Sequence, residues 1–328
     1  MNSHETHLER TISLIPLPYY WAGASVGVVL FFISVIILTL FEKSFEYIIS
    51  FFILSTLIAL QIVFVAWAHE QIRFLGDIFI DMIELPREEI LKWYEGQEAN
   101  IFNNRMMVLT GVSITVFAHL LGLDNFGFHP ELRYEFIFIK FYYIFAHYIM
   151  GASLYILVAT AFMVYKMGKL PLSVNVLLSK NIQFKGVLYS KFTLCAASVY
   201  LIWGFFHMST PSGLSTLQSK LWFSSFAVLL CAYFILPQYS LHQMMIETKK
   251  EKLGIFSSRL KDKAEEAIRN PTRENASILK SMLDIQCRLD EMCKWPFGFY
   301  EILHIVLIVI IPLIVVVLEI KFGVIKYP

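Results

Sequence analysis

Seven stretches of about twenty apolar residues, separated by loops that hold most of the charge, dominate this chain. A bilayer core about 30 Å thick is crossed by roughly 20 helical residues. Lipid offers no partner to backbone groups, and unbroken apolar runs lack the alternation of a membrane β-barrel. We therefore predict an all-α integral membrane protein with seven transmembrane helices. The predicted spans are Tyr20–Phe41, Tyr47–Ala68, Met106–Leu123, Phe136–Tyr165, Phe192–Met208, Leu221–Leu236 and Phe297–Ile320.

The polar remainder is too short for a separate soluble domain. Hydrophobic residues make up 57% of the chain and charged residues 16%, a composition typical of membrane proteins. We expect a six-span bundle with cytoplasmic loop helices over residues 1–245, a cytoplasmic helical hairpin over 246–294, and a seventh transmembrane helix with a short outer tail over 295–328. The four cysteines show no CxxC spacing, so we predict no disulfide, metal or cofactor.

The distribution of basic residues predicts the orientation. The N-terminal segment and the even-numbered loops hold 21 of the 27 Lys and Arg residues. The positive-inside rule places those segments in the cytoplasm and the C-terminal tail outside. We expect the plasma membrane as the location. Glu5 and Glu9 beside Arg10 do not resemble a secretory signal, so the first apolar run is expected to be retained.

Residues 246–294 are charged but periodic. Ile246, Leu253, Leu260 and Ala267 recur every seven residues, and Ile278, Met282, Ile285, Leu289 and Met292 follow a heptad rhythm. The break at Asn270-Pro271-Thr272 ends one helix, and Thr272 can cap the next. We predict an antiparallel hairpin whose first arm continues the sixth span. The residues expected to assemble it with other copies or partners are Leu253, Leu260, Ile285 and Leu289.

The loop over 69–105 is acidic and extends the second span. It carries eight acidic residues against four basic ones, whereas the hairpin carries nine against eleven. The two segments are therefore expected to pack with complementary charge, although the acids also suit a solvated face. A divalent-cation sensor is a further alternative. Pro86 is expected to open a helix that runs to Gly96.

A few polar residues fall within the spans, where ionisable groups are costly and tend to mark function. Lys140 and His147 are seven apart on the fourth span and share a face. Glu301 and His304 lie one turn apart near the cytoplasmic end of the seventh span, and Pro312 predicts a kink in that helix. These five residues are the candidate polar path or gate.

Lys140, Glu301 and His304 can also be explained by local structure alone, without a role in a path or gate. Lys140 can extend its charge to the outer interface, and Glu301 can pair with His304 or with His69 and Glu70 at the same depth. In the first span, Gly23 and Gly27 form a GxxxG spacing, which predicts close helix packing.

Residues 278–312 resemble a group of uncharacterised prokaryotic polytopic membrane proteins. Their cytoplasmic helix ends in a Trp-Pro-Phe motif directly before a last span that contains a proline. The matching residues here are Trp295, Pro296 and Phe297, followed by Pro312. In that group an acidic residue usually follows the Phe, whereas this chain has Gly298. The resemblance implies no particular chemistry.

The chain contains no HExxH, GxSxG, Walker glycine loop or potassium-filter signature, so we predict that it is not an enzyme. Three hypotheses remain open. The first is an oligomeric ion channel or pore, and the second is a non-conducting scaffold or signal-coupling protein. The third is a secondary transporter or intramembrane enzyme. The expected partners are the lipid bilayer, further copies of the chain and a cytoplasmic protein bound by the hairpin, with no nucleic acid.

Overall fold

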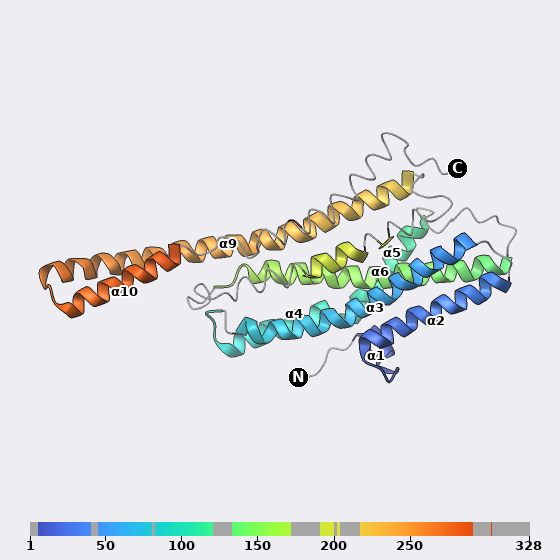
Figure 1. Cartoon of the computed structure of the whole chain (residues 1–328), viewed down its shortest axis with the longest axis horizontal. Coiled ribbons are helices and arrows are strands. Elements are labelled where there is room, and N and C mark those ends of the chain that lie inside the picture. Colours follow the sequence, from blue (N-terminus) through green and yellow to red (C-terminus); the bar gives the residue numbers. More distant parts are fainter. Residues whose placement is uncertain are drawn as a thin grey trace.

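Long helices run side by side along most of the molecule, and one helical pair extends beyond the others (Figure 1). The computed structural model describes residues 6–40, 45–80, 83–120, 133–171, 191–199, 202–203, 217–290 and 303. Over these residues the fold is all-helical. Its helices are α1 (His7–Ser13), α2 (Tyr19–Leu40), α3 (Phe45–Ile80), α4 (Arg87–Ile101), α5 (Asn104–Leu120), α6 (Arg133–Met167), α9 (Leu217–Arg269) and α10 (Arg273–Asp290).

Four helical stretches among the described residues are long and apolar enough to cross a membrane. They are Tyr19–Leu40, Phe51–Gly76, Arg87–Leu120 and Lys140–Met167, and they contain or overlap the first four predicted spans. The sixth predicted span lies within α9. The fifth is described only in part, and the seventh lies outside the described residues except for Leu303. Seven crossings therefore stay a prediction.

The core of the bundle is built by α3 and α6. In α3 and in α6, 56% of the most apolar 18-residue stretch is buried, against 22% in α2. Helix α2 is therefore peripheral. Helix α3 packs against α2 and α6, and α6 also packs against α5 and α9. Fully buried side chains from both central helices meet in this core, including Leu54, Ile58, Ile149 and Ile156. Large apolar side chains on the outer surface, such as Phe32 and Phe141, are exposed, as expected for a lipid-facing side.

Glycines set the closest helix approaches. A Cβ added at Gly27 of α2 would lie 2.7 Å from Cβ of Ala59 on α3, and one at Gly23 would clash with Cγ2 of Val63. The close packing predicted from the GxxxG spacing is therefore confirmed. The same device joins α5 to α6, where a Cβ at Gly151 would lie 2.7 Å from Cα of Gly111.

Two helices, α9 and α10, cover the segment predicted to form the hairpin. Helix α9 runs unbroken for 53 residues and contains the sixth predicted span, and α10 folds back against it (Figure 1). The hydroxyl of Thr272 accepts a hydrogen bond from the backbone N–H of Asn275 at 3.2 Å, as its predicted capping role requires.

The acidic loop over residues 69–105 contacts the first arm of the hairpin at one described point. Nζ of Lys252 lies 3.0 Å from a carboxylate oxygen of Glu84, in line with the expected charge complementarity.

Pro86 precedes α4, but the helix continues past Gly96 to Ile101, so the predicted end is wrong. A glycine in a helix costs only about 1 kcal/mol, and the apolar burial of Ile101 in the following turn offsets that cost.

The glycine contacts yield a matched pair of substitutions. We expect Gly27→Ala to lower the free energy of unfolding by about 1–3 kcal/mol, because the added methyl overpacks the α2–α3 contact. Gly254→Ala on α9 meets nothing within 4 Å and should raise it by up to about 1 kcal/mol. Unfolding of both variants in detergent measures the difference. Equal effects would contradict the close approach of α2 to α3.

Candidate functional site

A short N-terminal helix, α1, carries the first part of a polar network at the end of α2 nearer the hairpin (Figure 1). Thr6 and Glu9 form a capping box: the backbone N–H of Thr6 donates to Oε2 of Glu9 at 2.7 Å, and that of Glu9 donates to Oγ1 of Thr6 at 3.2 Å. Leu8 and Ile12 are buried on the same helix. The cap and the apolar face together fix the position of the Glu9 carboxylate.

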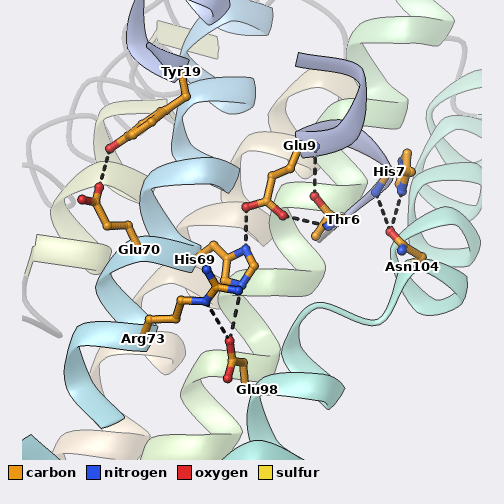
Figure 2. A network of polar contacts seen from close by, with 9 residues as sticks. All are labelled: Thr6, His7, Glu9, Tyr19, His69, Glu70, Arg73, Glu98 and Asn104. Carbon is orange, nitrogen blue, oxygen red and sulfur yellow. Dashed lines mark hydrogen bonds and ion pairs between the residues drawn. The ribbon is translucent and has the colours of Figure 1, made fainter. Parts of the chain in front are cut away.

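The imidazole of His69, on α3, lies at the centre of this network (Figure 2). Its Nδ1 is 2.5 Å from Oε1 of Glu9, and its Nε2 is 3.4 Å from Oε1 of Glu98 on α4. The His69 and Glu98 side chains are only 4% and 5% exposed, and the ring of Phe102 stacks on the imidazole at 4.1 Å. A carboxylate therefore faces each ring nitrogen, and only a doubly protonated ring offers a donor to both.

Arg73 completes the charge balance of the cluster. Its Nε donates to Oε1 of Glu98 at 3.2 Å, one helical turn from His69 (Figure 2). The Arg73 side chain is 42% exposed, so the cluster reaches the surface on that side. Two carboxylates then face one guanidinium and one imidazole. Buried charges are tolerated when paired in this way, and removal of one member leaves the others uncompensated.

The network also reaches the start of α5 and the middle of α6. The backbone N–H of His7 donates to Oδ1 of Asn104 at 2.7 Å, and the hydroxyl of Tyr148 on α6 lies 2.9 Å from Nε2 of His7. Separately, the hydroxyl of Tyr19 at the start of α2 donates to Glu70 of α3 at 2.7 Å. We call these residues, together with Thr6, Glu9, His69, Arg73 and Glu98, the boundary network.

The network joins α1 to α3, α4, α5 and α6 by polar contacts. Within the part of the chain that the structure describes, no group of three or more His, Cys, Asp and Glu side chains is placed to hold a metal ion. The arrangement is suited to hold helix ends together and to bind or release a proton at His69.

Two of the predicted path residues lie on α6, where His147 directly precedes Tyr148 of the network. His147 is buried, with Nδ1 2.9 Å from the carbonyl oxygen of Tyr143 and its ring 5.2 Å from that of Trp203. Lys140 lies seven residues earlier and is partly exposed. The packing of His147 among aromatic rings matches a core position. Neither residue was brought to the cluster that the structure assembles.

The remaining predicted residues divide between the hairpin and the undescribed part of the chain. Leu253 and Leu260 are half-buried on α9, Ile285 is 38% exposed on α10, and Leu289 lies within α10. The others fall outside the described residues, so their pairing with α3 and the resemblance to prokaryotic proteins stay predictions. They are Trp295, Pro296, Phe297, Glu301, His304 and Pro312.

The sequence analysis considered His69 only as a partner of Glu301 and missed its pairing with Glu9 and Glu98. Glu98 was counted among the acids of a polar loop, and Glu9 only as evidence against a secretory signal. A usable signal was present at Thr6 and Glu9, whose spacing matches a capping box and predicts a helix there. Nothing in the spacing indicates that this helix packs on α3.

Comparison of the chain with protein-family models, with curated proteins and with solved structures finds no match.

Glu98 provides the test of the network. We expect Glu98→Gln to lower the free energy of unfolding by roughly 2 kcal/mol, because it weakens the charge-assisted hydrogen bond from Arg73 and removes the ion pair with the buried His69. Glu95→Gln, an exposed acid on the same helix, should change it by less than about 0.5 kcal/mol. Unfolding in detergent measures both, and equal stability of the two variants would refute a structural role for the cluster.

Proposed function

We propose that this protein is a membrane scaffold that couples a helical bundle to a projecting hairpin. The observation that carries the proposal is the continuity of α9, which runs without a break from the predicted sixth span to Arg269 at the hairpin turn. A continuous helix transmits tilt and rotation along its length, whereas a loop would absorb them. A change in the packing of the bundle around α9 is thereby delivered to the hairpin.

A tight contact between α6 and α9 supports this coupling. The hydroxyl of Ser240 donates to the carbonyl oxygen of Tyr165 at 2.9 Å. A Cβ added at Gly168, just after α6, would lie 2.9 Å from the carbonyl oxygen of Ser240. Pro237 lies one turn earlier inside α9, where it removes a backbone hydrogen bond and allows the helix to bend. Helix α9 is therefore held against α6 at Ser240 and can bend at Pro237.

The hairpin is proposed to bind the hairpin of a second copy of the chain. Along α9, Leu253 and Leu260 are half-buried against α10, so two helices alone leave this apolar seam partly open. Ile278 and Ile285, seven residues apart on α10, are 40% and 38% exposed beside that seam. Two such stripes related by a two-fold axis would cover each other, as in a four-helix bundle.

The wider topology belongs to the same proposal. Seven crossings, with the N-terminus and the hairpin in the cytoplasm and the C-terminal tail outside, are supported by the distribution of Lys and Arg. The plasma membrane is the proposed location. In this arrangement Glu9, His69 and Glu98 of the boundary network lie toward the cytoplasmic side of the bundle, where α1 packs against it.

An oligomeric ion channel is the second candidate. It is favoured by polar side chains buried at the depth of the spans: the hydroxyls of Ser55 and Tyr142 lie 2.5 Å apart, and Gln61 is 1% exposed one and a half turns along α3. The path residues of this candidate remain Lys140, His147, Glu301, His304 and Pro312. The scaffold is preferred because His147 packs within one copy of the bundle.

The assembly can be tested on the hairpin. We expect the double variant Ile278→Glu, Ile285→Glu to reduce the mass of the detergent-solubilised particle to that of a single copy, because the charges oppose burial of the stripe. Light scattering coupled to size exclusion measures the mass. Ile268→Glu, the same change at an 80% exposed position near the hairpin turn, is the control. A double variant with unchanged mass would refute the hairpin contact between copies.

The choice between scaffold and channel rests on ion flux. We expect proteoliposomes of the purified chain to conduct no more than empty vesicles, with an added ionophore as the positive control. Flux that grows with the amount of protein and changes in Glu301→Gln would favour the channel instead. The measurement should cover several ions and pH values, because a gate can be closed under a single condition.

A further inference from the structure

A cavity of about 170 Å³ lies between α3, α6, the helical segment over residues 191–199 and α9. Its deep wall includes Gln61, Met150, Ser153 and Trp203, none more than 6% exposed. Its rim includes Val158 and Leu229, which are 40% and 51% exposed on the outer surface. The cavity therefore leads from the side of the bundle that lipid would cover toward the middle of the bundle.

Polar atoms at the bottom of this cavity have no partner in the structure. Both the Nε2 and the Oε1 of Gln61, and the Oγ of Ser153, are buried without a hydrogen bond. A buried amide is normally hydrogen-bonded, and hydrocarbon supplies no substitute for a missing partner. Gln61 lines the cavity with its amide directly behind the wall, so a rotation of the side chain brings the amide against an occupant of this space.

The lining also defines the chemistry of an occupant. Among the described lining residues there is no Asp, Glu, Lys, Arg or His, so the site gives no compensation to a charged group. Most of the wall is aliphatic or aromatic. A hydroxyl both donates and accepts, so one hydroxyl can satisfy the carbonyl and the NH₂ of Gln61, whereas a ketone can only accept. A dry cavity of about 150 Å³ holds a benzene ring, so this one has room for a group of that size.

We propose that this cavity binds an uncharged lipophilic alcohol, with its hydroxyl on Gln61 and Ser153 and its hydrocarbon directed to the lipid-facing rim. The alcohol can come from the bilayer or, as a short molecule, from water. The assignment does not depend on the scaffold function. It goes beyond it, because Leu229, Leu230 and Tyr233 of α9 line the cavity and so place its occupant against the helix that forms the hairpin.

Photolabelling of the full-length chain in phosphatidylcholine nanodiscs tests the site. The probe is 1-dodecanol with a diazirine in its chain, and attachment is mapped by mass spectrometry of peptides. We expect label on peptides that contain Ser153 or Cys195, reduced at least tenfold by excess 1-dodecanol and unaffected by dodecane. Competition by 1-hexanol at equal membrane concentration would show that a short alcohol suffices. Failure of 1-hexanol to compete would show that the long hydrocarbon chain of the alcohol, held in the bilayer, contributes to binding.

Substitution of two glutamines, Gln61 and Gln71, distinguishes a loss of binding from damage to the fold. Gln61→Met keeps the length of the side chain and removes its polar atoms. We expect it to reduce the competable labelling about tenfold while the ligand-free protein melts at an equal or higher temperature, because an unpaired buried amide is gone. A misfolded variant would lose both the competable labelling and the thermal stability. Gln71→Met, ten residues further along α3 and away from the cavity, should change neither.

Three results would overturn the proposal. The first is competition by dodecane equal to that by 1-dodecanol, which would mean that the cavity takes any hydrocarbon. The second is undiminished labelling in Gln61→Met. The third is label found only on outward-facing side chains such as Phe141 and Phe162, which are 66% and 59% exposed.

Discussion

The imidazole of His69, enclosed by the carboxylates of Glu9 and Glu98, is the contact on which this end of the bundle depends. The three groups come from α1, α3 and α4, and each would lose its water on burial. Such groups are stable together only when their charges and hydrogen bonds compensate one another. The end of α4, the part of α3 around His69 and the position of α1 are therefore fixed jointly. Through His7 and Asn104 the same constraint extends to α5.

The sequence predicted what depends on local pattern and missed what depends on distant pairing. Apolar length predicted the helices, the Gly23 and Gly27 spacing predicted close packing, and Thr272 predicted a helix start, because each signal lies within a few residues. The boundary network joins Glu9 to His69 across 60 positions and His7 to Asn104 across 97. No periodicity encodes such a pairing, so these residues could be recognised only as polar groups near a span.

One error came from giving a local signal too much weight. Gly96 was expected to end a helix because glycine is common after helix ends, yet a glycine that meets no neighbour is tolerated inside a helix at small cost. The burial of Glu98 against His69 and Arg73 lies beyond it and requires the helix to continue. The contacts of Glu98 with His69 and Arg73 thus explain why α4 continues past Gly96.

The length of α9 gives the Gly168–Ser240 contact a mechanical meaning. At about 1.5 Å per residue, roughly 35 Å of helix lies between Leu217 and Ser240 and roughly 44 Å between Ser240 and Arg269. The contact thus holds α9 directly after the point where Pro237 allows a bend, and the longer arm runs from there to the hairpin turn. Each degree of tilt about this contact displaces the hairpin tip by about 0.8 Å, so a few degrees move the tip by half a helical turn. A small repacking among the spans suffices to change the register between two hairpins.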